Sequence, residues 1–277
     1  MSRPLNLLEE RVVRSLFDDD SVKEWQVDGE NIVKPDVESD FTIVCSLIEL
    51  AQMLDDVLGP LELPHSAEFN DVWVVNHPMV KDSLGHLRNG SKEIQAFRHH
   101  SDKIVEYLFA AATRGLSLRD VTVQTPLQET STQKLKDSVV VVPVLRSGLT
   151  MLTAAMKALP KSKIGMFGLA RNENTFIAEE YYVKMPQREC IEGSVVVITD
   201  PMLATGGSAY HVIEHMMEYN PKEIILVCVV TAPEGIRKIK EKFPEVTIVT
   251  AAIDNGLNGD NFIIPGLGDY GDRYFGT

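Results

Sequence analysis

The chain has 277 residues, of which 44% are hydrophobic and 24% are charged. That length fits one large α/β domain or a domain with an appendage, and the composition excludes a wholly disordered chain. The net charge of −13 argues against sequence-independent binding to nucleic acid or to an anionic membrane surface. We therefore expect neither a nucleic-acid partner nor a membrane partner.

The acidity is concentrated in the first quarter of the chain. Residues 1–70 hold 5 Lys and Arg against 16 Asp and Glu, whereas residues 71–277 hold 22 against 24. This asymmetry predicts an acidic N-terminal extension over 1–70, followed by the main domain over 71–277. Apolar residues at helical spacing over 41–58, ending at Gly59-Pro60, predict at least one packed helix in the extension. The acidic run at 18–20 is interpreted as solvated, and a specific docking tail is the less favoured alternative.

Cysteine usage and the N-terminus bear on the compartment. Cys45, Cys190 and Cys228 are too few and too scattered for a disulfide framework or a cysteine-based zinc site. The start of the chain lacks the long apolar stretch of a signal peptide, and no window approaches the roughly 20 apolar residues of a membrane span. These features predict a reducing, cytoplasmic setting.

From residue 72 onward, short β-branched runs alternate with segments of helical spacing. Continuous apolar strands separated by helix-length segments are typical of a parallel sheet covered on both faces. We expect an open, doubly wound, mostly parallel α/β sheet. The predicted strands are 72–75, 139–143, 195–199, 224–231 and 246–253. The predicted helices are 92–114, 148–159, 207–219 and 234–242.

A loop of small residues lies between the predicted strand at 195–199 and the helix that follows it. Ligands of open α/β sheets bind outside the carboxyl ends of the strands, and a helix N-terminus presents unpaired N–H groups to an anion. Gly206 and Gly207 allow close backbone approach, while the hydroxyls of Thr205 and Ser208 add donors. The pattern predicts a phosphate site. The alternative is an ordinary glycine turn with a serine N-cap.

Asp200, at the end of the same strand, indicates which phosphate compound binds. A carboxylate beside a phosphate loop is placed to accept hydrogen bonds from sugar hydroxyls, so a phosphosugar is the natural ligand. The sequence has no GxxxxGK[ST] motif, which disfavours a P-loop kinase.

The segment DPMLATGGS over 200–208 resembles the PRPP-binding motif of uracil phosphoribosyltransferases. The resemblance extends in order over about 72–277, and it implies the type I phosphoribosyltransferase fold. It also implies transfer of the phosphoribosyl group of PRPP to uracil, giving UMP and diphosphate in pyrimidine salvage. The other similar segments are HPMVKDSLGHLR at 77–88, PVLRSGLTM at 143–151, GLARNENT at 168–175, APEG at 232–235 and IIPGLGDYGDRYFGT at 263–277.

The reaction develops positive charge on the ribose and negative charge on the departing diphosphate, so catalysis should rely on cations and N–H dipoles. By resemblance, Arg146 and Arg171 bind PRPP, although Arg146 alone could merely pair with a surface carboxylate. Ribose recognition falls chiefly on Asp200, because Pro201 stands where many related enzymes have a second acid. The resemblance implies that the catalytic residues are Arg146, Arg171, Asp200 and Asp269. It assigns PRPP binding to these four and to Pro201, Met202, Leu203, Ala204, Thr205, Gly206, Gly207 and Ser208.

For the base, the resemblance implies a C-terminal loop, or hood, whose uracil-binding residues are Ile263, Gly268, Asp269 and Tyr270. Backbone amides would set specificity, because the cytosine amine would meet an N–H where uracil O4 should bind. The ring of Tyr270 is a candidate wall of the pocket, with a packed surface tyrosine as the alternative. Phe262 stands where tyrosine is usual in the family. The polar segment over 172–190 is interpreted as an arm or lid that excludes water.

The resemblance also bears on cofactors and partners. Enzymes that use PRPP generally need a divalent cation, and Mg²⁺ carried with PRPP requires few protein carboxylates, so no metal site built of protein ligands is expected. Some members of the family are activated by GTP and assemble as dimers or tetramers. GTP is therefore a candidate activator, and a homodimer or homotetramer is expected.

Three other interpretations of the sequence are less favoured. The GxGxxG pattern at 266–271 lacks room for the helix and strand of a dinucleotide site. The HxxEH pattern at 211–215 resembles a zinc-peptidase motif but lacks a third ligand, so both histidines are interpreted as solvated. A non-catalytic homologue that senses PRPP or UMP is the main alternative. It would show a damaged base loop or a basic face, and the loop here is intact.

Overall fold

The computed structural model describes residues 3–4, 26–28, 31–36, 40–46, 65–66, 69–90, 93–171 and 178–277. The chain divides into two units, Met1–Glu62 and Leu63–Thr277. Among the described residues, no helix combines the length and the apolar character needed to cross a membrane.

The described part of the first unit is an antiparallel sheet with the strand order β1-β2-β3-β4. Its strands are β1 (Arg3–Pro4), β2 (Gln26–Asp28), β3 (Asn31–Asp36) and β4 (Asp40–Ser46). The helix predicted to start at residue 41 is therefore wrong over 41–46. Thr42, Ile43 and Val44 are consecutive β-branched residues, which favour a strand over a helix. The rest of that predicted helix, 47–58, and the acidic run at 18–20 lie outside the described residues.

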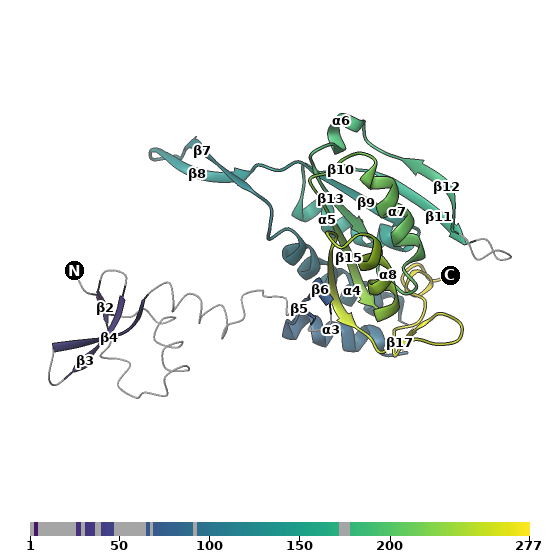
Figure 1. Ribbon diagram of the computed structural model, residues 1–277, viewed down its shortest axis with the longest axis horizontal. Coiled ribbons are helices and arrows are strands. Elements are labelled where there is room, and N and C mark those ends of the chain that lie inside the picture. Colours follow the sequence, from purple (N-terminus) through teal and green to yellow (C-terminus); the bar gives the residue numbers. More distant parts are fainter. Residues whose placement is uncertain are drawn as a thin grey trace. The chain divides into compact units, whose positions relative to one another are not determined.

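The second unit is built on a mostly parallel sheet with the order β12-β11-β9-β13-β15-β16-β6-β5 (Figure 1). Only the two edge pairs, β11 with β12 and β5 with β6, are antiparallel among these described strands. Two short strands, β10 and β14, pair with β9 and β15. The bounds are β5 (His65–Ser66), β6 (Phe69–Val74), β9 (Val139–Leu145), β10 (Lys163–Ile164), β11 (Met166–Arg171), β12 (Ala178–Lys184), β13 (Val195–Thr199), β14 (Met202–Leu203), β15 (Glu223–Thr231) and β16 (Thr247–Ile253).

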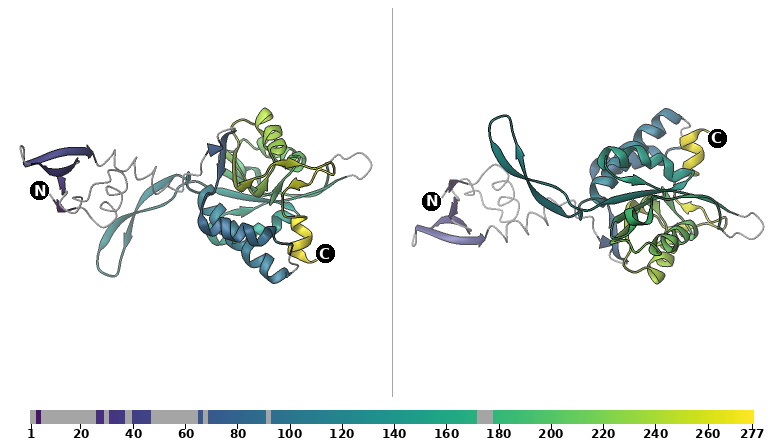
Figure 2. Two further views of the ribbon diagram at one scale, coloured as in Figure 1. Left: turned by 90° about the horizontal axis from the view of Figure 1, so that it is seen from below. Right: turned by 90° about the horizontal axis from the view of Figure 1, so that it is seen from above.

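Helices cover both faces of this sheet, as the two views of Figure 2 show. Successive residues of a strand point to opposite faces, so Val139 and Val141 of β9 pack with one helical layer and Val140 and Val142 with the other. The first layer contains α3 (Pro78–Arg88), α4 (Ile94–Ala112), the 3₁₀ helix η2 (Ser147–Met151), α5 (Leu152–Ala158) and α9 (Tyr270–Phe275). The second contains α6 (Arg188–Ile191), α7 (Gly207–Met217) and α8 (Pro233–Lys242). The doubly wound, mostly parallel fold is confirmed.

Several of the described elements were not predicted. Helix α3 lies within the motif at 77–88, and the hairpin of β7 (Leu118–Gln124) and β8 (Glu129–Leu135) projects from the body of the sheet (Figures 1 and 2). The hairpin gave no buried-strand signal because nearly all of its side chains are exposed. In the segment interpreted as a lid, 178–184 form β12, and 172–177 lie outside the described residues.

Candidate active site

The candidate residues gather where the central parallel strands end. β9 runs into Arg146, β13 into Asp200, β15 into Ala232, the N-cap of α8, and β16 into Asp254. Neighbouring parallel strands have their carboxyl ends at one edge of the sheet, so residues far apart in sequence meet there.

The small-residue loop before α7 has the geometry of an anion site. Gly206 is the N-cap of α7 with a φ of 74°, and a Cβ there would lie 2.9 Å from the carbonyl oxygen of Gly235. Only glycine meets both demands without strain. Gly206 has no side chain to cap the helix, so first-turn N–H groups remain for a ligand. Ser208 lies inside the helix, which excludes the alternative of a serine-capped turn.

This loop lines a cavity of about 370 Å³. The lining residues are Asp200, Met202, Leu203, Ala204, Thr205, Gly206, Gly207, Ser208, Ala209 and Lys238. The last of these, on α8, was missed by the sequence analysis because it lies in a charged helical stretch that looks like an ordinary solvated face. Its Nζ lies 3.9 Å from the point where a Cβ on Gly207 would stand. The phosphate loop therefore has a cation beside it.

Asp200 is one of the residues that line this cavity. The hydroxyl of Ser147, in the turn after β9, donates to its Oδ1 over 3.4 Å. Burial raises the pKa of Asp200 to about 6, against the opposing effect of hydrogen bonds from the Met202 N–H and Ser147. The carboxyl is thus mainly ionised at neutral pH and can accept hydrogen bonds.

A second cavity of about 230 Å³ adjoins the first. It is lined by Ser147, Asp200, Met202, Ala204, Asn261, Phe262, Ile263, Gly268, Asp269, Tyr270 and Gly271. Three residues, Asp200, Met202 and Ala204, line both cavities. A ligand with its phosphate in the first cavity and a planar ring in the second would place the sugar between them at Asp200.

The loop over the second cavity, called the base loop below, includes β17 (Gly256–Leu257) and β18 (Ile263–Ile264), which pair with each other. It is held by two residues that the sequence analysis did not single out. Arg88, the last residue of α3, binds Asp254 through Nη1–Oδ2 and Nη2–Oδ1 contacts of 2.9 and 2.5 Å. Asp254 also accepts from the N–H of Gly266 over 2.8 Å, and Arg88 donates to the Gly266 carbonyl over 3.0 Å. Both groups of this ion pair therefore hold the loop.

Tyr270 does not have the orientation expected of a pocket wall. Its side chain is 1% exposed, its hydroxyl bonds to Ser101 and its ring lies edge-on to Phe97. It lines the second cavity but is otherwise buried in the core, so it is not the surface tyrosine of the alternative. The ring anchors the loop to α4. Phe262, 52% exposed, is the aromatic side chain that remains accessible among the residues lining the second cavity.

Of the remaining predicted residues, Asp269 lines a cavity, whereas Arg146 lines neither of the two. Arg146 follows β9 directly, its side chain is 62% exposed, and its Nη2 lies 3.1 Å from Oδ1 of Asp272 on α9. Asp269 lines the second cavity and caps α9, where its Oδ1 accepts from the Asp272 N–H over 2.8 Å. Arg171 is the last residue of β11, and its side chain lies outside the described part of the structure.

Comparison with known proteins identifies the family to which this chain belongs. Residues 74–277 match the family described as uracil phosphoribosyltransferase. The chain belongs to the uracil phosphoribosyltransferase family. The predicted family, fold class and enzyme class, a pentosyltransferase, are thereby confirmed.

The sequences of individual uracil phosphoribosyltransferases match this chain along nearly their whole length. One from Ureaplasma parvum is 40% identical over 205 residues, covering 74% of this chain and 98% of the relative. Another, from Dictyoglomus turgidum, is 44% identical over 207 residues, covering 74% and 99%. A solved Aquifex aeolicus protein is 34% identical with a TM-score of 0.70, covering 74% of this chain and 97% of that one.

The two histidines of the HxxEH pattern have other partners among the described residues. Nε2 of His211 lies 2.7 Å from Oε1 of Glu180, and His215 packs edge-on against Phe167 with its ring centroid 5.0 Å away. Both histidines are half-buried rather than solvated, because the β11–β12 hairpin lies against this face of α7. Neither belongs to the group of potential metal ligands found in the described residues.

Proposed function

We propose that the chain transfers the phosphoribosyl group of PRPP to uracil, giving UMP and diphosphate in pyrimidine salvage. The observation that carries this proposal is the pair of adjoining cavities that share Asp200, Met202 and Ala204. One cavity has the helix N-terminus that a phosphate needs. The other cavity lies under the base loop near the C-terminus. Their junction is where the ribose of PRPP would lie.

In this proposal uracil N1 forms a bond to C1′ of the ribose as the C1′–O bond breaks with its electron pair leaving on diphosphate, and the proton of uracil N1 is released to the departing diphosphate. The loop at 204–208 binds the 5′-phosphate, and Asp200 accepts hydrogen bonds from the ribose hydroxyls. Arg146 and Arg171 stabilise the charge that develops on diphosphate. Ile263, Gly268 and Tyr270 bind uracil through backbone groups, and Asp269 faces both substrates.

Mg²⁺ enters with PRPP. This cation usually keeps several waters and binds through substrate phosphates with one or two carboxylates. Asp200, which lines both cavities, fits that modest requirement. The one group of three or more potential metal ligands in the described part of the chain lies elsewhere, on α3 and α4. When bound, Mg²⁺ supplies charge neutralisation on the diphosphate.

We further propose that the chain works in the cytoplasm as a homodimer or homotetramer. The projecting hairpin supports assembly, because Leu127 at its tip is 94% exposed and an isolated two-stranded hairpin is marginally stable in water. A second copy packed on the hairpin would cover Leu118, Leu127 and Leu135. Light scattering, which measures the mass of the particle in solution, tests the oligomeric state. GTP activation rests on family membership and is tested by adding GTP to the assay.

The decisive experiment mixes the chain with uracil, PRPP and Mg²⁺ and measures UMP, with cytosine and hypoxanthine as competing bases. We expect UMP from uracil and at least 10⁴-fold less product from cytosine, whose amine meets an N–H donor in the base cavity. PRPP binding without any UMP would favour the alternative of a non-catalytic sensor. The described base loop, held by Arg88 and Asp254, does not have the damage expected of one.

Lys238→Ala is expected to raise KM for PRPP about fivefold and to change kcat less than about twofold. The ammonium group lies beside the phosphate loop and contacts a group that does not react, so it binds ground state and transition state alike. An exposed charge pair contributes about 1 kcal/mol to binding, which corresponds to the fivefold change in KM. Steady-state kinetics measure it, with Lys242→Ala at the end of the same helix as control. An unchanged KM would show that Lys238 does not contact PRPP.

Activity should also fall in mild acid. Because burial raises the pKa of Asp200 to about 6, kcat/KM for PRPP is expected to drop about tenfold per pH unit below 6.

The same carboxyl affects stability. The folded chain keeps the proton on Asp200 at pH values where the unfolded chain, with a pKa near 3.9, has released it. Asp200 therefore makes stability decrease as pH rises from about 4 to 6. Urea unfolding at several pH values measures this, and Asp200→Asn should remove that pH-dependent component. A pH-independent difference in stability between the parent and Asp200→Asn would contradict it.

A further inference from the structure

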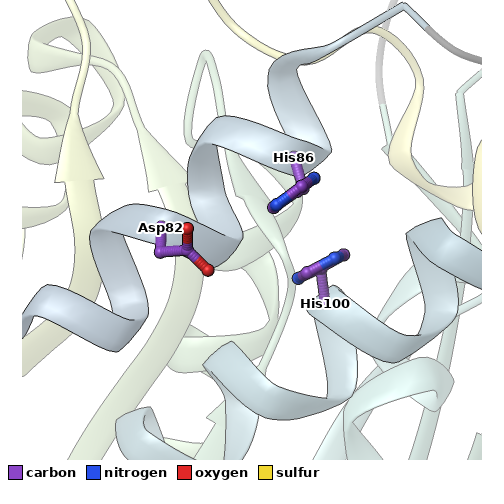
Figure 3. Close-up of side chains that lie close together, drawn as sticks. All are labelled: Asp82, His86 and His100. Carbon is purple, nitrogen blue, oxygen red and sulfur yellow. The ribbon is translucent and has the colours of Figure 1, made fainter.

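Three side chains capable of binding a metal meet on the outer surface of the first helical layer. Asp82 and His86 lie four residues apart on α3 and so share one face of that helix, while His100 lies on the neighbouring α4. One ligand atom from each lies within 4.8 Å of the other two. Figure 3 shows the two imidazoles between the helices, each with a nitrogen at the edge nearer the Asp82 carboxylate.

The stacked rings must part before they can hold an ion, because the in-plane lone pairs of two parallel imidazoles do not converge on one point. The imidazole rings of His86 and His100 stack with centroids 4.0 Å apart and planes 8° from parallel. Tetrahedral bonds of about 2.1 Å separate ligand atoms by about 3.4 Å. The side chains of Asp82 and His86 are exposed, so torsional rotation can bring their atoms that much closer.

His100 has a second contact of the kind that orients metal ligands. Its Nδ1 lies 3.2 Å from Oγ of Ser83, which is fully buried. Metal-bound histidines commonly donate their other ring N–H to such a partner, which fixes the ring orientation. If Ser83 accepts from Nδ1, Nε2 of His100 presents its lone pair to the ion.

We propose that Asp82, His86 and His100 form a binding site for a divalent transition metal such as Zn²⁺ or Ni²⁺, which clamps α3 to α4. Two imidazoles and one carboxylate suit these ions, whereas Mg²⁺ prefers an all-oxygen shell. Three protein ligands leave a fourth position for water. None of the three residues lines either active-site cavity, so this site is separate from the Mg²⁺ carried with PRPP.

The clamp has a structural consequence. α3 ends two residues after His86, at Arg88, which holds Asp254 and the base loop. An ion that ties His86 to α4 therefore restrains the helix end on which that loop depends. The expected effect is a gain in stability of the folded chain, which does not require the proposed transferase reaction.

The test is calorimetric titration of the untagged full chain with ZnCl₂ and, separately, NiCl₂, with no PRPP present. We expect one ion per chain with a Kd in the micromolar range or tighter. At a metal concentration one hundred times Kd, the Tm should rise by roughly 5–10 °C. No binding of either ion at micromolar concentration would overturn the proposal.

Variants show where the ion binds. His86→Ala and Asp82→Asn should each weaken binding at least tenfold, and neither exposed position is needed for folding, which circular dichroism checks. His99→Ala, which removes the histidine next to His100, should retain the parent affinity. The visible spectrum of the Co²⁺ complex should change in His86→Ala. Parent affinity in both His86→Ala and Asp82→Asn would place the ion elsewhere and refute the site.

Discussion

Arg146→Ala is expected to lower kcat with PRPP and uracil by at least about 10²-fold while the chain stays folded. In the proposed reaction this guanidinium stabilises negative charge that develops on diphosphate only as the C1′–O bond breaks, so its loss appears in kcat. Its contact with Asp272 is an exposed ion pair, which contributes at most about 1 kcal/mol to stability. Steady-state kinetics and thermal unfolding separate the two effects.

Asp272→Asn is the matched control for this prediction. It weakens the same ion pair but leaves Arg146 in place, so it should have a kcat close to that of the parent. Arg146→Lys keeps the charge but not the planar fork, and an intermediate kcat is expected. If Arg146→Ala and Asp272→Asn were equally active, the arginine would serve only as the surface partner of Asp272.

Much of the fold could be predicted because its signals are local. The β-branched run at 139–143 is buried on both faces, and such a run has few alternatives to a central strand. The position of Asp200 followed from the end of another such strand, together with the glycines after it. In the N-terminal unit two local signals conflicted, since the apolar spacing over 41–58 suited a helix while Thr42, Ile43 and Val44 favoured the observed strand.

The contacts that hold the base loop could not be predicted from local patterns. Arg88 and Asp254 are 166 residues apart, and Ser101 and Tyr270 are 169 apart. Their pairing depends on how α3 and α4 pack against the sheet, which a single sequence does not reveal. The orientation of Tyr270 was missed for this reason, since a tyrosine beside a binding loop suits either a pocket wall or a buried anchor.

Arg88→Ala is expected to destabilise the chain by about 3 kcal/mol and to raise KM for uracil at least tenfold. The side chain of Asp254 is only 4% exposed, so removing its partner leaves a buried, uncompensated carboxylate. The loop also loses the hydrogen bond from Arg88 to the Gly266 carbonyl, which positions the end of the base cavity. Urea unfolding and uracil saturation curves measure the two effects.

The double variant Arg88→Ala/Asp254→Asn separates the buried charge from the lost loop contact. A neutral amide removes the unpaired charge, so the double variant should regain part of the stability lost in Arg88→Ala. Its KM for uracil should remain high, because neither side chain then supports Gly266 as before. If Arg88→Ala unfolds at the parent's urea concentration, the ion pair does not hold the loop. Should Arg88→Ala fail to fold, the double variant still measures the effect on uracil binding.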